Sequence, residues 1–199
     1  MAIIEENALS KKLERKIILY LVNIDNYHSK FNQLKDLMEY FKYKKINFAI
    51  IDIEEEQLKK FKNTPLATLL FNFKIPYYPT FIPEHTKRYF SRVILKKEDQ
   101  IQNFKEKLDK LPDKNSSKGN SLKFWIELYT KELIENRDFF NLKIKPQYLA
   151  ETILKKIEEC REKVITFIHL GIEKTFPEIT KILKEVNPNM DISYLHYLC

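Results

Sequence analysis

Short apolar runs alternate with amphipathic stretches along the first half of the chain. Residues 17–23 and 47–53 are rich in β-branched and aromatic side chains and are bounded by polar residues, which is typical of buried strands. Over residues 29–44 and 98–111, apolar side chains recur instead every three or four positions, which predicts amphipathic helices. Strands that alternate with helices indicate parallel pairing.

Two prolines mark the next predicted strand. Pro76 and Pro79 exclude a central strand that runs through both of them, because proline cannot donate to the ladder of a sheet. Pro79 followed by Thr-Phe-Ile predicts the start of a strand, and residues 89–95 predict its antiparallel partner. These elements predict an α/β domain over residues 1–111, with a mixed sheet and helices on both of its faces.

The second half of the chain has a different pattern. Residues 112–121 are polar, contain Pro, Gly and three Ser, and predict a linker. From residue 122 to residue 199, apolar side chains follow helical spacing, which predicts an all-α C-terminal domain. Three apolar stripes support this prediction: Leu122, Trp125, Ile126, Tyr129 and Leu133; Leu149, Ile153, Ile157, Cys160, Val164, Phe167 and Ile168; and Ile172, Phe176, Ile179, Leu183 and Val186.

Composition and charge narrow the classes of function. The 199 residues carry a net charge of +7, and residues 1–111 hold most of it, with 21 Lys and Arg against 15 Asp and Glu. A basic surface could attract nucleic acid, but a lysine-rich composition balanced by glutamates is the simpler explanation. Only Gly119 and Gly171 are glycines, too few for phosphate-binding loops, so we expect no nucleotide cofactor.

The few cysteines and histidines predict neither a disulfide framework nor a metal site. Cys160 and Cys199 are far apart, and no histidine stands at metal-ligand spacing from Cys, Asp or Glu. The first sixteen residues are charged and lack the apolar region of a secretory signal, and no apolar run is long enough to insert into a membrane. These features predict a cytoplasmic protein.

One segment carries a resemblance to a known family. Residues 73–81 read Phe-Lys-Ile-Pro-Tyr-Tyr-Pro-Thr-Phe, and residues 48–52 upstream read Phe-Ala-Ile-Ile-Asp. Residues 17–111 thereby resemble the thioredoxin-like superfamily, and most closely its protein disulfide isomerase-type domains. The resemblance implies a thioredoxin-like mixed sheet, although the stretch between Asp52 and Pro79 is about ten residues longer than this type of domain leads us to expect.

The same resemblance places a redox site where this chain has no cysteine. The Cys-x-x-Cys position of the family falls on Asn26, Tyr27, His28 and Ser29. Thiol–disulfide exchange needs a thiolate, which neither Asn nor Ser can replace. The domain is therefore expected to be redox-inactive, with no catalytic residue of this kind and no cofactor.

A second feature of the family is a proline whose peptide bond is cis, which here would be Tyr78–Pro79. In redox members the residue before this proline pairs with an extended peptide, and Tyr78 could do so without a cysteine. Asn26, Tyr27, His28, Ser29, Tyr78 and Pro79 are therefore the predicted binding residues. The alternative is that the proline is kept only because the fold requires it.

Three functions follow from these observations. The first is a redox-inactive binding module that engages a polypeptide partner as a chaperone, adaptor or assembly factor, with a homodimer as a further form of association. The second is an enzyme or binding protein of the glutathione-transferase type, in which Tyr20 or Tyr27 would activate the thiol. The third is nucleic-acid binding through the basic N-terminal half. The first two rest on the resemblance, and the binding module is the interpretation that the missing cysteines favour.

Overall fold

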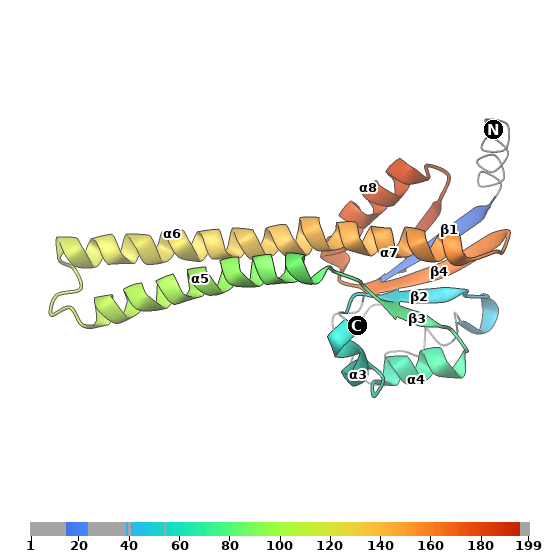
Figure 1. Cartoon of the computed structure of the whole chain (residues 1–199), viewed down its shortest axis with the longest axis horizontal. Coiled ribbons are helices and arrows are strands. Elements are labelled where there is room, and N and C mark those ends of the chain that lie inside the picture. Colours follow the sequence, from blue (N-terminus) through green and yellow to red (C-terminus); the bar gives the residue numbers. More distant parts are fainter. Residues whose placement is uncertain (1–14, 24–38, 40, 54, 196–199) are drawn as a thin grey trace. The chain divides into compact units, whose positions relative to one another are not determined.

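A computed structural model describes residues 15–23, 39, 41–53 and 55–195. The described residues separate into two compact units. One contains the described residues up to Phe81 and from Pro146 onward, and the other is Ile82–Lys145. The first unit is an α/β domain, and the second is a helical hairpin inserted into its sequence (Figure 1).

The α/β unit is built on a parallel sheet. Within the described residues the sheet has five strands: β1 (Lys16–Asn23), β2 (Phe48–Ile51), β3 (Tyr77–Pro79), β4 (Val164–Gly171) and β5 (Asp191–Leu195). Their order is β3-β2-β4-β1-β5, and every described pair is parallel. The long central pair, β1 and β4, aligns Lys16 with Val164 and Asn23 with Gly171. Central strands buried on both faces explain the continuous apolar runs in the sequence.

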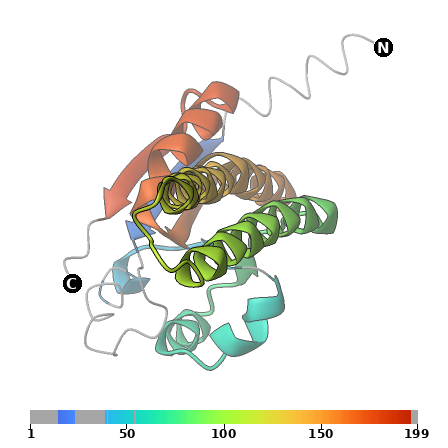
Figure 2. The ribbon, with the colours of Figure 1, turned by 90° about the vertical axis from the view of Figure 1, so that its left-hand side faces the viewer.

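Helices cover both faces of this sheet. The short η2 (Glu55–Gln57), α3 (Leu58–Phe61) and α4 (Pro65–Asn72) connect β2 to β3 on one face. On the other face lie α7 (Lys145–Glu159), η4 (Glu173–Thr175) and α8 (Phe176–Val186). Figure 2 shows the two layers end-on, with α8 in red and α4 in teal. The β2–β3 and β4–β5 connections run in opposite directions along the sheet and on opposite faces, as right-handed crossovers require.

Each face of the sheet has its own apolar core. Alternate residues of β2 divide between the two cores, with Ala49 and Ile51 toward α4 and Phe48 and Ile50 toward α7 and α8. Thr64 begins α4 because its hydroxyl accepts a hydrogen bond from the Ala67 amide at 3.2 Å. The helical contributions to the cores come from these residues: Phe61, Leu66, Ala67, Leu69 and Leu70 on one face, and Leu149, Ala150, Ile153, Ile157, Phe176, Ile179 and Leu183 on the other.

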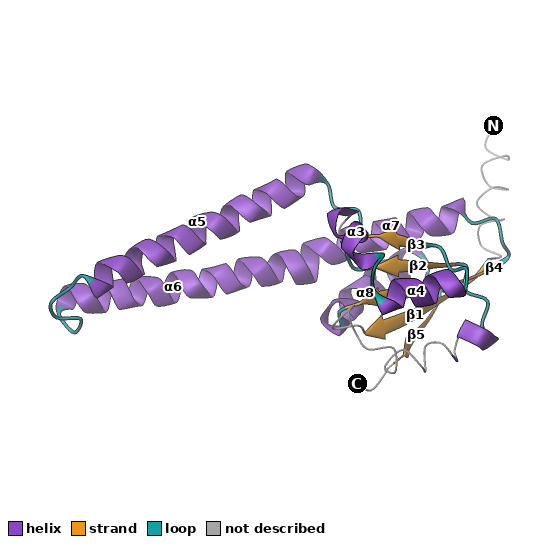
Figure 3. Ribbon diagram, turned by 90° about the horizontal axis from the view of Figure 1, so that it is seen from below, coloured by secondary structure: helices purple, strands orange, loops and turns teal. Residues whose placement is uncertain are grey.

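The hairpin unit consists of two long helices. α5 (Glu84–Asp109) and α6 (Ser117–Phe139) lie side by side and are joined by a short turn (Figure 3), and α6 continues into the π-helical η3 (Phe140–Ile144). Apolar and aromatic side chains along both helices recur at alternating steps of four and three residues, the repeat of a coiled coil. The positions on α5 are 90, 94, 97, 101, 104 and 108, and Lys97 is the exception to their apolar or aromatic character. On α6 and the start of η3 they are 122, 126, 129, 133, 136 and 140, where Asn136 is the exception. The hydroxyl of Ser116 caps α6 by accepting a hydrogen bond from the Gly119 amide.

The structure confirms the α/β class with helices on both faces, and it corrects the predicted mixed sheet. Residues 89–95, predicted as an antiparallel strand, lie inside α5. Their partner was expected to begin at Pro79, but β3 ends there and pairs in parallel with β2. The physical reason is that Phe90 and Ile94 continue the helical repeat of residues 97–108, and the Phe90 ring packs against Phe139 of α6.

The all-α prediction for residues 122–199 is also wrong. The run Val164–Gly171 forms β4 at the centre of the sheet, and Asp191–Leu195 forms the edge strand β5. Residues 165–170 are all buried, because β4 is covered by helices on both sides. The stretch expected to be a linker, 112–121, forms the turn between α5 and α6 and the first residues of α6, inside the hairpin unit.

Candidate functional site

The residues predicted to bind a partner are only partly described. Asn26, Tyr27, His28 and Ser29 lie outside the described residues. Tyr78 and Pro79 belong to β3, an edge strand of the sheet, and Pro79 aligns with Ile51 of β2.

The predicted cis peptide bond is wrong. The Tyr78–Pro79 bond is trans, and the strand continues straight to the proline. An edge strand tolerates proline because the amide that proline lacks would have no partner on the outer side. The Tyr78 ring is half-buried, meets the Phe48 ring edge-on at 6.4 Å and carries the Lys156 ammonium 4.1 Å above its centre. Tyr78 is therefore a packed side chain of this edge.

The strand order places β1 and β3 apart in the sheet. β2 and β4 lie between β3 and β1, the strand that leads toward residues 26–29. With neighbouring strands about 4.8 Å apart, the carboxyl ends of β1 and β3 are roughly 14 Å apart. The described backbone therefore does not bring Asn23, at the end of β1, beside Pro79. Tyr20, a candidate of the glutathione-transferase alternative, packs in the middle of β1 against the core that faces α4.

A buried polar cluster occupies the carboxyl edge between β2 and β4. Asp52 follows β2, and His169 and Gly171 end β4, and all three are buried. A Cβ atom placed on Gly171 would lie 2.4 Å from His169 Nε2 and 3.1 Å from the Asp52 Cβ. His169 Nδ1 lies 3.3 Å from the carbonyl oxygen of Ile50, and its ring meets Phe176 edge-on.

This cluster lies where the connections after β2 and β4 leave in opposite directions, a position at which open α/β sheets commonly bind ligands. The His169 side chain is fully enclosed, however, so it is placed to order the edge and not to contact a ligand. Asp52 and Gly171 are far apart in the sequence, and the helical prediction for the stripe that ends at Ile168 hides the strand that brings them together.

A different surface is rich in exposed aromatic side chains. On the hairpin, four rings form a connected group that we call the aromatic patch: Phe104, Phe124, Trp125 and Tyr129. Their neighbouring ring centres are 5.6 to 5.7 Å apart. Phe124 is 59% exposed and Trp125 is 42% exposed. Contacts between α5 and α6 therefore support the patch, while the rings of Phe124 and Trp125 remain in solvent.

Aromatic side chains also gather at the other end of the seam. Phe90 packs against Phe140 with ring centres 4.9 Å apart, and Tyr89 and Phe139 border this pair. Tyr89 and Phe139 are each more than half exposed. Phe139 stands fourteen residues after Trp125, which is two coiled-coil repeats and about 21 Å along a helix. The two residues therefore occupy equivalent positions on one side of α6.

The hairpin carries most of the net positive charge of the chain. Residues 82–145 contain 15 Lys and Arg against 10 Asp and Glu, so they supply +5 of the total of +7. Lysines border the aromatic patch directly. The Lys97 ammonium lies 4.2 Å from the centre of the Tyr129 ring and also pairs with Glu132, and Lys107 lies 5.7 Å from the Phe104 ring. The surface combines apolar rings with a basic surrounding.

The described residues offer little for covalent or metal chemistry. Burial raises the pKa of the Cys160 thiol, and the neighbouring Glu162 and Glu159 raise it further, so the thiol is a poor nucleophile. Among the described residues, no group of three or more His, Cys, Asp or Glu side chains could jointly bind a metal ion. None of the described helices combines the length and hydropathy of a membrane-spanning segment.

No protein-family model, curated protein or solved structure matches the chain.

Proposed function

We propose that this protein binds a polypeptide partner through the aromatic patch and the adjoining basic surface of its helical hairpin. The observation that carries the proposal is the exposed group of rings around Trp125, supported by a two-helix seam. Exposed apolar groups of this kind, rimmed by polar residues, are typical of protein-binding surfaces. Tryptophan and tyrosine are also the side chains that contribute most to binding energy at such surfaces. The proposal does not depend on the thioredoxin-like resemblance, which stays a prediction.

The charge of the hairpin favours an acidic amphipathic helix as the partner. A second copy of the hairpin would bring together two surfaces of the same net positive charge, which opposes self-association. A partner helix along α6 would meet Trp125 and Phe139 with apolar residues about fourteen positions apart. Its acidic side chains would face lysines such as Lys107, which borders the patch.

The test uses the full-length protein and two synthetic helical peptides of 21 residues. Both carry leucines at coiled-coil spacing, and their remaining positions hold Glu in one peptide and Lys in the other. Trp125 is the chain's only tryptophan, so its fluorescence reports directly on the patch. We expect the acidic peptide to shift the emission to shorter wavelength, because binding removes water from the ring, and the basic peptide to leave it unchanged.

Variants locate the binding surface. Calorimetry should show the acidic peptide binding at least about tenfold more weakly to the Phe124→Ala/Trp125→Ala protein. Phe71→Ala is the matched control, since Phe71 is an exposed aromatic residue on α4. Equal binding of both peptides, or equal loss in the Phe71 variant, would contradict the proposal. Tighter binding of a 20-nucleotide oligo(dT), with an affinity that falls steeply with salt, would show a nucleic-acid surface instead.

A further inference from the structure

A second site lies in the α/β unit, at the amino-terminal edge of the sheet. Here the segment 41–46 leads into β2 and the segment 73–75 leads into β3. Between them is a cavity of about 360 Å³, within the range of small-molecule sites. It is independent of the hairpin surface, because all of its lining residues belong to the α/β unit.

The inner wall of this cavity is apolar. It is formed by the buried side chains of Phe41, Ile46 and Ile75 together with the half-buried Phe73. The Phe41 and Phe73 rings meet edge-on with their centres 5.6 Å apart. These four residues belong to or border the core that faces α4, so the wall is held by the packing of the domain.

The rim of the cavity is basic. Lys42, Lys44 and Lys45 line it, together with Tyr43. Lys45 is engaged, because its ammonium pairs with both carboxylate oxygens of Glu162 at 3.1 and 3.2 Å. Within the described part of the chain, Lys42 and Lys44 have no carboxylate within ion-pairing distance. Among the described residues, these two ammonium groups at the rim of the cavity are therefore without a carboxylate partner.

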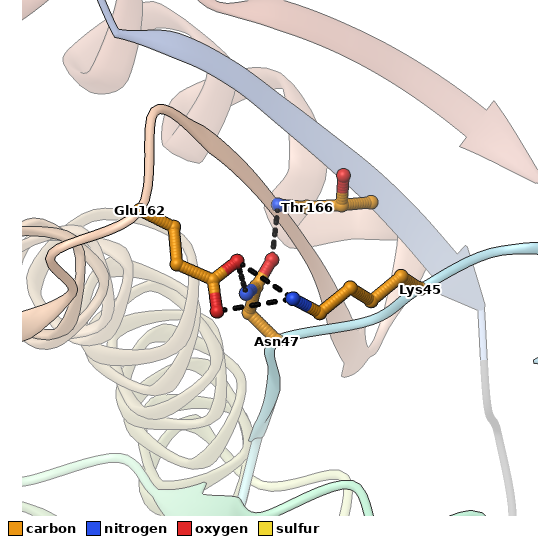
Figure 4. Close-up of polar contacts among 4 residues, drawn as sticks. All are labelled: Lys45, Asn47, Glu162 and Thr166. Carbon is orange, nitrogen blue, oxygen red and sulfur yellow. Dashed lines mark hydrogen bonds and ion pairs between the residues drawn. The ribbon is translucent and has the colours of Figure 1, made fainter.

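A polar network around Glu162 fixes the rim of the cavity at Lys45 (Figure 4). The Asn47 amide donates to Glu162 at 2.7 Å, and its side-chain oxygen accepts from the Thr166 amide of β4 at 2.8 Å. The backbone amide of Asn47 in turn donates to the Thr166 carbonyl at 2.7 Å. Glu162 thus engages Lys45 and Asn47 at this rim.

We propose that this cavity binds a small amphiphilic anion, with an apolar body against Phe41, Ile46, Phe73 and Ile75 and an anionic head group at Lys42 and Lys44. An apolar wall with a few charged groups at its mouth is the usual construction of a site for such a ligand. A free organic acid has the chemistry that fits both parts.

The test titrates the full-length protein with 4-phenylbutyrate and with 4-phenylbutanol, which has the same body and no charge. Isoleucine methyl NMR signals identify the site, assigned through Ile46→Val and Ile75→Val. We expect saturable shifts of the Ile46 and Ile75 methyl groups with phenylbutyrate and weaker binding of phenylbutanol. The methyl group of Ile153, in the core on the other face of the sheet, should not shift.

Charge variants complete the test. Lys42→Gln/Lys44→Gln should weaken phenylbutyrate binding about fivefold or more, because two charge-assisted contacts are lost. The matched control is Lys59→Gln/Lys60→Gln, which removes two exposed lysines from α3. Unmoved Ile46 and Ile75 signals, equal binding of the two compounds, or an equal loss in the control variant would each overturn the proposal. Failure here leaves the hairpin proposal untouched, since that proposal is measured at Trp125.

Discussion

Gly171 offers the sharpest test of how the carboxyl edge of the sheet is packed. Substitution by alanine adds a Cβ atom 2.4 Å from His169 Nε2 and 2.7 Å from Cε1. Ordinary contacts of this kind begin near 3.4 Å, so the imidazole must withdraw by about 1 Å. The ring has little freedom to do so, because it is fully buried, packs against Phe176 and lies 3.3 Å from the Ile50 carbonyl.

The expected cost follows from this crowding. Overpacking a buried site costs about 1–3 kcal/mol. Gly171 does not have a positive φ, so alanine adds no backbone strain there. Alanine also gives the unfolded chain less conformational entropy than glycine does, which stabilises the folded state by about 0.4–1 kcal/mol. Gly171→Ala should therefore lower the free energy of unfolding by at most about 2.6 kcal/mol, and by about 1.3 kcal/mol for the middle of both ranges.

A double-mutant cycle separates the clash from other effects. Urea unfolding followed by circular dichroism is measured for Gly171→Ala, His169→Ala and the double variant. Removing the imidazole removes the clash, so the double variant should be more stable than the sum of the single effects predicts, by the overpacking cost of about 1–3 kcal/mol. If the two effects add to within about 0.5 kcal/mol, the proposed contact between residues 169 and 171 is wrong.

Three further predictions concern other parts of the α/β unit. Lys74 follows the C-cap of α4, Phe73, and has a φ of 55°. Lys74→Gly should therefore raise the free energy of unfolding by about 0.5–1 kcal/mol and Lys74→Ala should not, as urea unfolding will show. Hydrogen bonds from the side chains of Asn47 and Lys45 lower the pKa of Glu162. The ionised Glu162 carboxylate therefore stabilises the folded protein fully above about pH 4.3, and this stabilisation is lost as the pH falls through the lower pKa of the folded state. The difference in free energy of unfolding between the unmodified protein and Glu162→Gln should therefore vanish in acid. In a Cys199→Ser background, Cys160 should react with iodoacetamide more slowly than free cysteine at about pH 7.5, because its pKa is raised.

Several elements could be predicted from the sequence because their local patterns are distinct. The apolar runs at 17–23 and 47–53 form β1 and β2, and Thr64-Pro65 begins α4 as proline at a first helical turn predicts. The apolar stripe that begins at Leu149 forms the buried face of α7. Each of these segments has its own local signal: β-branched and aromatic composition for the two strands, proline at a first helical turn for α4, and helical spacing for α7.

β4 could not be predicted in the same way. A strand that is buried on both faces shows no alternation of polar and apolar residues. Cys160, Val164, Phe167 and Ile168 happen to follow the helical spacing that continues from α7, so the strand was interpreted as more helix. The meeting of Asp52 with Gly171 depends on the order of the strands, which is a property of the whole sheet and leaves no local signal in the sequence.

The hairpin unit, Ile82–Lys145, is inserted between β3 and β4, and its removal leaves the crossover connection that this part of the sheet requires. A parallel crossover needs about a dozen residues, and α7 with its 15 residues already provides them. Thr152 of α7 places its hydroxyl 3.5 Å from the Phe81 amide, and Pro146 lies only six residues, or about 9 Å of helix, before Thr152. A linker of about six glycine and serine residues should therefore span from Phe81 to Pro146.

We expect the chain with residues 82–145 replaced by this linker to fold as a cooperative α/β unit, measured by circular dichroism and urea unfolding. If the hairpin serves binding rather than folding, the shortened chain should lose affinity for the acidic peptide, measured by calorimetry because Trp125 is removed. It should retain the response of Ile46 and Ile75 to phenylbutyrate. A shortened chain that remains unfolded would show that the hairpin contributes to the stability of the sheet. That result would contradict the interpretation that the 64 residues of the hairpin serve partner binding and not folding.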